Sequence, residues 1–296
     1  MTAPFPFISK EWLLEDPKSS IENVQRMLNE CSALSTAYAS IFSKRLMISL
    51  VYISNEIERT LPSGTEESEI YKYLDDVFDA IDALGCLLPA AEKWNAEGKY
   101  AGETKFTKVQ LLQHMRSLKF LFSGLASRMT VSGLLQAHGI LMNGAVDEKK
   151  MPVAAGVFRD HPCHAGNHAY PEGDPVMLER SLQRMLDEFN DAAAASDGTV
   201  LTKLQASTKL FYDVITLHPF QNGNGRLCRI IFAFAMAKMG FPFPVQLTTG
   251  HKSARKHYMK AILLSRRGDM RELNTTALMS LEYGLCNFLE NVRLAK

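Results

Sequence analysis

Hydrophobic residues recur every three or four positions along most of the chain, which is the spacing of one face of an α-helix. The clearest series runs through residues 20–60 and comprises Leu34, Tyr38, Ile41, Phe42, Leu46, Ile53 and Ile57. It predicts one long helix that ends near Pro62, because proline cannot continue the helical hydrogen-bond ladder. Alternating patterns typical of strands are sparse.

The same spacing predicts further helices along the rest of the chain. They fall at 66–95 (as a pair), 107–127, 130–142, 176–192, 200–216, 224–239, 253–267 and 270–293. Between them, residues 145–175 carry seven helix-breaking prolines and glycines from Pro152 to Pro175 and predict a loop with a hairpin. The fold class is therefore all-α, with a small β-hairpin.

Composition is ordinary for a globular protein of 296 residues, with 46% hydrophobic residues and a net charge of +1. This balance favours neither a nucleic-acid partner nor a membrane surface. The five cysteines include no Cys-x-x-Cys pair, which predicts reduced thiols in the cytoplasm, with a nuclear location equally compatible. The start of the chain lacks the pattern of a secretory signal, and the apolar run at 46–54 is too short to span a bilayer.

The stretch LHPFQNGNGRLCR, residues 217–229, concentrates polar groups at the start of the hydrophobic helix predicted over 224–239. Gly223 and Gly225 leave backbone N–H groups exposed at a helix N-terminus, where the helix dipole favours anions. Arg226 and Arg229 share a helix face and suit phosphate oxygens. His218 can accept a proton near neutral pH. This combination predicts an anion site with a general base at its edge.

The simpler interpretation, a capped helix start with a chance histidine, would suit the Gly-Asn-Gly sequence alone. The whole stretch resembles the signature of the Fic family (the Fic/Doc or Fido fold), His-x-Phe-x-(Asp/Glu)-Gly-Asn-(Gly/Lys)-Arg-x-x-Arg. The chain matches seven of the eight defined positions. Residues 130–144 and the sequence Gly156-Val157-Phe158-Arg159 also resemble family segments, namely the helix before the flap and the start of the flap.

This resemblance implies two domains and a set of site residues. Residues 106–296 would form the Fic domain, and residues 1–105 an N-terminal helical region. Most enzymes of the family transfer AMP from ATP to a hydroxyl group of another protein. His218 would be the general base, and Phe220 would anchor the loop in the core. The phosphate ligands would be Gly223, Asn224, Gly225, Arg226 and Arg229.

One position departs from the signature. Asn222 stands where the family has the acidic residue that holds the Mg²⁺ bridging the nucleotide phosphates. An amide oxygen can still ligate a hard cation, but it brings no charge. We therefore expect Mg²⁺ to bind weakly at Asn222, and the alternative is a chain with little transfer activity.

Residues 54–59, SNEIER, resemble the family's regulatory motif Ser/Thr-x-x-x-Glu-(Gly/Asn). Ser54 and Glu58 lie four positions apart, on one helix face. The resemblance implies that Glu58 pairs with Arg229 and occupies the place of the γ-phosphate. Arg59 departs from the motif, and Glu56 is the competing acid. The alternative is a solvent-exposed glutamate at a charged helix end.

Other residues attract less specific interpretations. The cluster His161, Cys163, His164 and His168 has a metal-like spacing, but Pro162 and Gly166 interrupt it, so incidental loop histidines are favoured. His251, His257 and Tyr258 fall near the helix at 253–267, where packing is favoured over a place beside the adenine.

The leading hypothesis is a protein adenylyltransferase with ATP as substrate, an unknown target protein and autoinhibition by Glu58. The alternatives are a Fic enzyme that removes AMP and a nucleotide-binding regulatory protein without efficient transfer. We expect no nucleic-acid or membrane partner, and the family is compatible with a homodimer.

Overall fold

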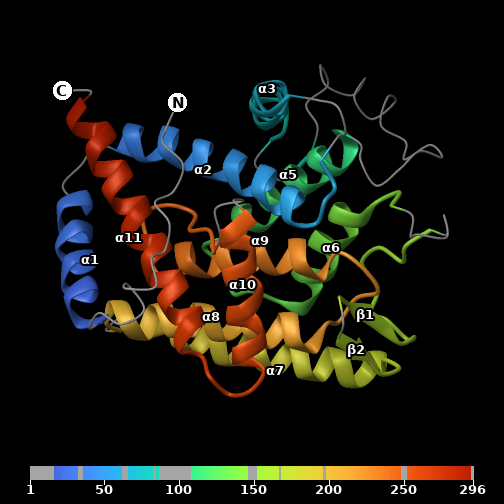
Figure 1. The fold of residues 1–296 in the computed structure, drawn as a ribbon. Coiled ribbons are helices and arrows are strands. Elements are labelled where there is room, and N and C mark those ends of the chain that lie inside the picture. Colours follow the sequence, from blue (N-terminus) through green and yellow to red (C-terminus); the bar gives the residue numbers. More distant parts are fainter. Residues whose placement is uncertain are drawn as a thin grey trace.

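The computed structural model of the chain describes residues 17–32, 36–61, 66–82, 85–86, 108–145, 152–166, 168–195, 198–247 and 252–294. These residues are mainly helical, as the hydrophobic spacing predicts (Figure 1). The helices are α1 (Pro17–Ser32), α2 (Thr36–Ile57), α3 (Glu67–Asp79), α5 (Lys108–Ser123), α6 (Val131–Met142), α7 (Pro175–Ala194), α8 (Val200–Leu217), α9 (Asn224–Lys238), α10 (Lys252–Ser265) and α11 (Arg271–Leu294). None of these described helices is long and apolar enough to cross a membrane.

The N-terminal hydrophobic series forms two helices rather than one. α1 ends at Ser32 and α2 begins at Thr36, so the prediction of one helix over 20–60 is wrong. The predicted pair over 66–95 is confirmed for its first half, α3, and most of its second half lies outside the described residues. α2 still ends within a few residues of Pro62, where the sequence predicts the stop.

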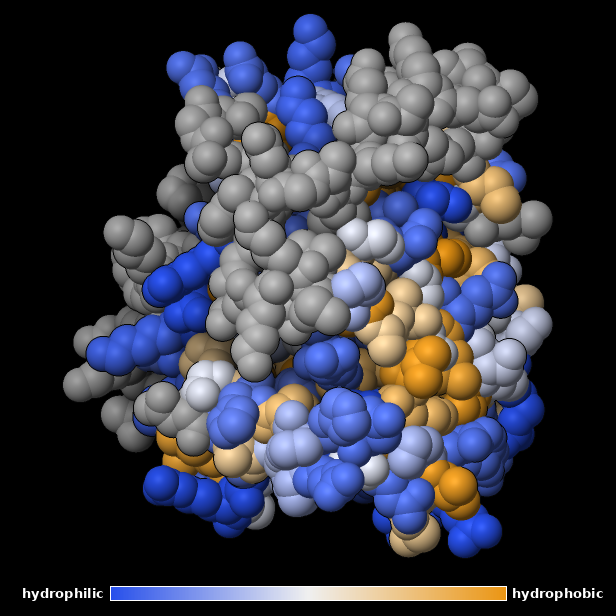
Figure 2. All heavy atoms as spheres, turned by 90° about the vertical axis from the view of Figure 1, so that its right-hand side faces the viewer, coloured by the Kyte–Doolittle hydropathy of each residue, from blue (hydrophilic) through white to orange (hydrophobic). Residues whose placement is uncertain are grey.

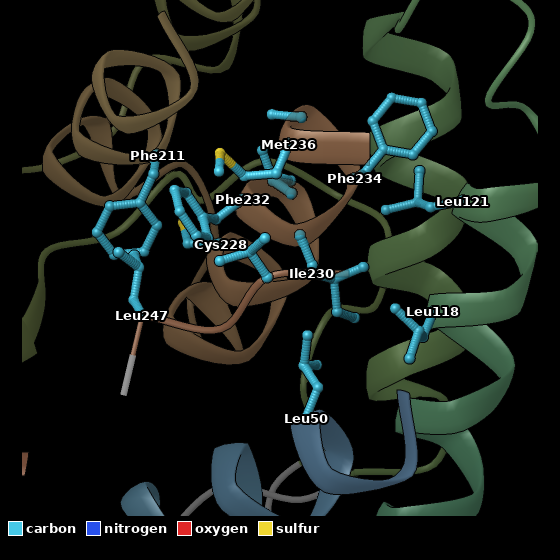
Figure 3. Close-up of a cluster of buried hydrophobic side chains, with 14 of the residues drawn as sticks. Leu50, Leu118, Leu121, Phe211, Cys228, Ile230, Phe232, Phe234, Met236 and Leu247 are labelled. Atoms are coloured by element: carbon cyan, nitrogen blue, oxygen red, sulfur yellow. The ribbon is translucent and has the colours of Figure 1, made fainter. Parts of the chain in front are cut away.

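α9 is the central helix of the fold. It contacts α8 on one side and α2, α5 and α6 on others, and every residue from Arg226 to Met236 is buried. A helix that is hydrophobic on all sides requires such an enclosed position. Figure 3 shows the side chains that surround it, with Leu50 from α2, Leu118 from α5 and Phe211 from α8. The rigid packing of α9 fixes the position of its N-terminus.

The short strands β1 (Cys163–Ala165) and β2 (His168–Tyr170) form the antiparallel hairpin that the breaker-rich segment predicts. Cys163 pairs with Tyr170, and both side chains are buried. α7 begins directly afterwards, where Asp174 accepts hydrogen bonds from the N–H groups of Val176 and Met177. Figure 2 shows this side of the molecule, where hydrophobic side chains gather in one area beside hydrophilic ones.

The outer helices complete the fold around this centre. α11 packs against α1, α10 and α8, and α7 packs against α8. Buried residues of α1, α2 and α3 belong to the same hydrophobic cluster as those of α9 and α11. The N-terminal helices therefore pack directly on the C-terminal part, and the domain boundary at residue 105/106 stays a prediction.

Candidate active site

His218 lies at the point where α8 ends. It is the C-cap of α8 and adopts a left-handed conformation with φ 51° and ψ 59°, which is uncommon for a residue with a β-carbon. The His218 Nδ1 atom lies 3.4 Å from the carbonyl oxygen of Ile215. A carbonyl only accepts hydrogen bonds, so this contact places the proton on Nδ1 and leaves the lone pair on Nε2. His218 therefore has the tautomer that a general base needs.

Residues in and before the hairpin contact His218, and a residue that follows α10 supports them. The Tyr170 ring stacks on the His218 ring, with centroids 4.2 Å apart. Arg159 Nε donates to the His218 carbonyl oxygen at 2.7 Å, and Arg266 Nη2 donates to the Tyr170 hydroxyl at 2.5 Å. Burial, together with the charges of Arg159 and Arg266, lowers the pKa of His218 to about 4. The imidazole is therefore neutral at physiological pH.

Phe220 anchors the loop between α8 and α9. Its side chain is 1% exposed and stacks on the His138 ring, with centroids 3.8 Å apart, and it lies parallel to the Phe158 ring at 5.8 Å. The Asn224 amide closes the loop, because its Oδ1 accepts from the Phe220 N–H and its Nδ2 donates to the Phe220 carbonyl. The Asn224 side-chain donor expected at a phosphate is thus used within the loop.

His138 on α6 is a site residue that the sequence reasoning missed. Its Nε2 lies 2.9 Å from the Asn222 carbonyl oxygen, and its Nδ1 accepts from the Gly156 N–H at 2.9 Å. Burial lowers the pKa of His138 to about 4, so the ring is neutral and can accept at one nitrogen while it donates at the other. The only sequence signal is a single histidine within the hydrophobic residues of α6.

Gly223 begins α9 in a left-handed conformation with φ 77°. A β-carbon at this position would lie 2.6 Å from the Met142 sulfur atom, so a larger residue would require both a strained backbone and a shift of Met142. The Gly223 N–H donates to the Asn222 side-chain oxygen at 2.7 Å. The Asn222 side-chain oxygen, which the sequence assigns to a metal, is therefore bonded to the loop backbone instead. The same bond uses the Gly223 N–H group, which the sequence assigns to a phosphate.

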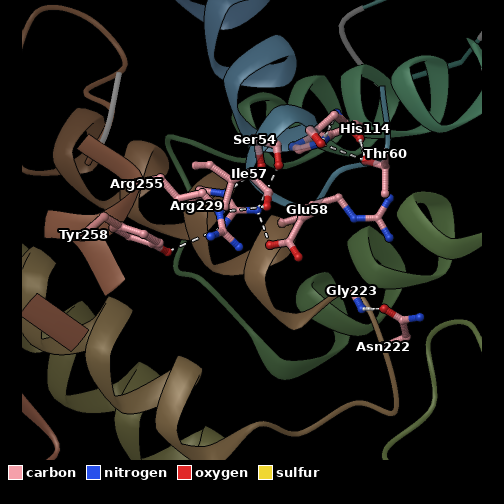
Figure 4. A network of polar contacts seen from close by, with 12 residues as sticks. Ser54, Ile57, Glu58, Thr60, His114, Asn222, Gly223, Arg229, Arg255 and Tyr258 are labelled. Atoms are coloured by element: carbon pink, nitrogen blue, oxygen red, sulfur yellow. Dashed lines mark hydrogen bonds and ion pairs between the residues drawn. The ribbon is translucent and has the colours of Figure 1, made fainter. Parts of the chain in front are cut away.

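The two arginines of α9 point in different directions within the protein. Arg226 Nη1 donates to Gln110 Oε1 of α5 at 2.7 Å, and its Nη2 lies 3.3 Å from the Met142 sulfur atom. Arg229 reaches toward α2, where its Nε donates to the Ser54 hydroxyl at 2.7 Å (Figure 4). Both guanidinium groups are buried, so each is fixed in orientation before any ligand binds.

Glu58, the second residue of the proposed regulatory pair, forms an ion pair with Arg229. The Arg229 Nη2 atom lies 2.6 Å from Glu58 Oε1, and Arg229 Nη1 lies 3.4 Å from the Tyr258 hydroxyl. Partial removal from water disfavours the charged form of Glu58, but the charge and hydrogen bond of Arg229 outweigh this effect and lower its pKa. The Glu58 side chain is still 36% exposed.

The Glu58 carboxylate also lies over the first turn of α9. A β-carbon added to Gly225 would lie 2.4 Å from Glu58 Oε1. A carboxylate at a helix N-terminus is favoured by the helix dipole, as a phosphate would be. The Glu58 carboxylate therefore lies at the helix N-terminus for which the sequence predicts an anion site. Glu56, the competing acid, is exposed on α2.

Other predicted site residues lie elsewhere. His164 and His168 are exposed on the hairpin strands, and no group of three potential metal ligands occurs among the described residues. Tyr258 is buried against Arg229, which agrees with packing, and His251 lies outside the described residues.

Residues 128–236, which contain the hairpin, His218 and most of α9, match the model of the Fic/DOC family. This segment of the chain is therefore similar to the Fic/DOC family. The curated relatives include the protein adenylyltransferase Fic of Drosophila willistoni, which is 24% identical over 243 residues and covers 79% of this chain. The same-named protein of Drosophila melanogaster is 23% identical over 242 residues and covers 78% of this chain. This chain spans less than half the length of these relatives, 43% and 44%.

Solved structures share the fold of this chain. Residues 134–508 of Fic-1 from C. elegans superpose with a TM-score of 0.66 at 16% identity, over 94% of this chain and 73% of that one. A Fic domain-containing signaling protein from Bacteroides thetaiotaomicron superposes with a TM-score of 0.62 at 14% identity, over 92% of this chain and 97% of that one. These similarities place the helical core and hairpin in the Fic fold.

Proposed function

We propose that this protein transfers AMP from ATP to a hydroxyl group of a target protein. The observation that carries the proposal is the neutral His218 next to the N-terminus of α9. That helix carries Gly225 in its first turn, followed by the buried guanidinium groups of Arg226 and Arg229. The names of the curated relatives support the same reaction class.

The proposed reaction needs one base and one anion site. The Nε2 atom of His218 takes the proton of the target hydroxyl as its oxygen bonds to the α-phosphorus of ATP. The bond from that phosphorus to the bridging oxygen breaks, and pyrophosphate leaves. Arg226 and the N-terminus of α9 stabilise the charge on the phosphates, because buried donors of fixed orientation need no rearrangement during the reaction.

The described residues offer few ligands for Mg²⁺ at this site. The amide oxygen of Asn222 is neutral and already accepts the Gly223 N–H, and the described residues near it offer no cluster of carboxylates. Mg²⁺ prefers several oxygen ligands of which one or two are carboxylates. These residues do not fit the metal site that the family signature implies, and the proposed steps use none of its chemistry.

Glu58 is proposed to restrain this reaction. Its carboxylate lies over Gly225 and pairs with Arg229, the guanidinium assigned to the γ-phosphate. A triphosphate and this carboxylate would carry like charges in one space, so ATP has to displace Glu58 to bind with all three phosphates in place. The proposed enzyme is therefore autoinhibited.

The test measures transfer of label to protein from ATP that is labelled on the α-phosphate. The parent protein in this test carries Glu58→Gly, which removes the proposed restraint. His218→Ala should reduce label incorporation by about 10²–10⁴-fold, the usual contribution of a general base. The matched control is His161→Ala, which changes a histidine whose side chain is 75% exposed on the hairpin side. Equal labelling by His218→Ala and its parent would contradict the proposal. ATP binding without any transfer would instead support a regulatory nucleotide-binding protein.

A second candidate reaction is the removal of AMP from a modified protein. The observation that favours it is the position of Glu58, which is close enough to His218 for its charge to act on the imidazole and is partly open to water. Glu58 could orient the attacking water. Release of AMP from an AMP-modified protein by the parent chain, but not by Glu58→Gly, would select this reaction over transfer.

A further inference from the structure

Each of the last four carbonyl groups of α2 accepts a hydrogen bond. A helix leaves its last four carbonyl groups without partners inside the helix. Here the Ser54 carbonyl accepts from Arg229 Nη2 at 3.1 Å and the Ile57 carbonyl accepts from Arg255 Nε at 3.2 Å. The remaining two carbonyl groups, those of Asn55 and Glu56, accept from the backbone N–H groups that follow Glu58.

The chain reverses after Glu58 in a Schellman-type turn. The Arg59 N–H donates to the Glu56 carbonyl at 3.0 Å, and the Thr60 N–H donates to the Asn55 carbonyl at 2.8 Å. In this turn the residue at the position of Arg59 must adopt a left-handed conformation, and glycine usually occupies it. Arg59 has φ 56°, and His218 is the only other described residue with a β-carbon and a positive φ. Arg59 is therefore strained.

A buried cluster opposes this strain. Asn55 is fully buried, and its Nδ2 donates to the Val51 carbonyl at 2.7 Å and lies 3.0 Å from His114 Nδ1 of α5. The Thr60 hydroxyl donates to Asn55 Oδ1 at 2.8 Å. We call Asn55, Thr60 and His114 the α2 clamp. It connects the chain on both sides of Glu58 to α5, a buried helix of the core. Figure 4 labels Thr60 and His114 of this cluster.

His114 can act only as an acceptor toward Asn55. Burial, with the charges of Arg226 and Arg229 next in effect, lowers the pKa of His114 well below its usual value. The ring is therefore neutral, and its Nδ1 lone pair faces the Asn55 amide. A buried amide N–H group without a hydrogen-bond partner costs free energy. Loss of the His114 acceptor would therefore destabilise the folded end of α2.

We propose that the turn at Arg59 and the α2 clamp together set how firmly Glu58 occupies the phosphate site, and that Glu58 leaves when this turn opens. This inference rests on the proposed role of Glu58 as an inhibitor. The α2 clamp favours the closed turn, in which the Arg59 and Thr60 N–H groups bond to α2. The strained left-handed conformation of Arg59 favours the open turn, in which these bonds are broken. Asn55, Thr60 and His114 are thus positioning residues for Glu58, although none of them pairs with Arg229.

The first experiment measures the turn itself, by hydrogen exchange of the Thr60 amide. Arg59→Gly removes the strain and should slow this exchange roughly fivefold, because glycine adopts the left-handed conformation without steric conflict. Arg59→Ala is the matched control, since it removes the same side chain but keeps the β-carbon, and it should exchange like the parent. His114→Leu should accelerate the exchange, and His114→Asn, which restores an acceptor, should bring it part of the way back.

The second experiment measures ATP affinity in the same variants, with and without Glu58→Gly. Arg59→Gly should weaken ATP binding roughly fivefold and His114→Leu should strengthen it, but only where Glu58 is present. Unchanged Thr60 exchange in Arg59→Gly, or equal affinity changes with and without Glu58, would overturn the inference. If Glu58→Gly alone leaves ATP affinity unchanged, the inhibitory role fails, and the inference falls with it even if the exchange results hold.

Discussion

Arg229 Nη2 and Glu58 Oε1 lie 2.6 Å apart, although the two residues are 171 positions apart in the sequence. The guanidinium comes from the central helix α9, and the carboxylate follows the end of α2. This contact joins the N-terminal helices to the segment that matches the Fic/DOC family model. It also places a negative charge where a nucleotide phosphate is proposed to bind, so the binding of ATP and the position of α2 are expected to be coupled.

Glu58→Gln should strengthen ATP binding by about tenfold, because the variant keeps the size of the side chain but loses the charge that opposes a phosphate. A tenfold change corresponds to about 1.4 kcal/mol. Isothermal titration calorimetry with ATP measures it directly. The control is Glu56→Gln, which alters the neighbouring exposed glutamate and should leave the affinity unchanged. Equal effects of both substitutions would show that only net charge matters.

Asn222→Asp should increase the dependence of ATP binding and transfer on magnesium, because a carboxylate adds the charged oxygen ligand that this site lacks. The measurement is a magnesium titration of both variants at fixed ATP. The parent chain should show a shallow response and the variant a steep one. Identical titration curves would mean that residue 222 has no part in metal binding.

Gly225→Ala should weaken the Glu58–Arg229 ion pair, because the new methyl group would lie 2.4 Å from Glu58 Oε1. In the Glu58→Gly background the same methyl group meets no carboxylate, but it still enters the phosphate space, so ATP affinity should fall. Calorimetry on the single and double variants separates the two effects. Gly124→Ala is the control, since its β-carbon would make only an ordinary contact at 3.4 Å.

Phe220→Ala should lower the free energy of unfolding by about 3–5 kcal/mol, the usual loss for a large buried aromatic side chain. Phe220→Leu should lose less, since it keeps most of the buried volume but not the ring stacked on His138. Urea denaturation measures both. A loss below about 1 kcal/mol for the alanine variant would contradict the role of Phe220 as the anchor of the loop.

Stability should fall as the pH drops below about 6.5, the value for an unperturbed histidine. The pKa values of His138 and His218 are lowered to about 4, so between pH 6.5 and 4 the unfolded chain binds protons that the folded chain does not. The loss of stability begins near the pKa of histidine in the unfolded chain and is complete below the pKa of these histidines in the folded chain. Urea denaturation at pH 7.5 and pH 5 measures it, and His138→Gln should reduce the difference by about 2 kcal/mol.

Much of the fold was readable from local patterns. The three- and four-residue spacing predicts most of the helices, because each must bury one face. Proline and glycine predict the segment that holds the hairpin. The break between α1 and α2 escaped this reasoning, since the hydrophobic spacing continues through residues 33–35 without a helix-breaking residue.

The sequence by itself predicted an anion site at residues 218–229, because its histidine, glycines and arginines lie close together in the chain and the properties of a helix N-terminus are local. Only the tertiary structure decided what surrounds this site. His138 and Tyr170 reach the site from α6 and the hairpin, Gln110 and His114 from α5, and none is marked by its neighbours in sequence. Their positions depend on how the helices pack around α9. That packing sums many weak contacts between distant segments, which no local pattern records.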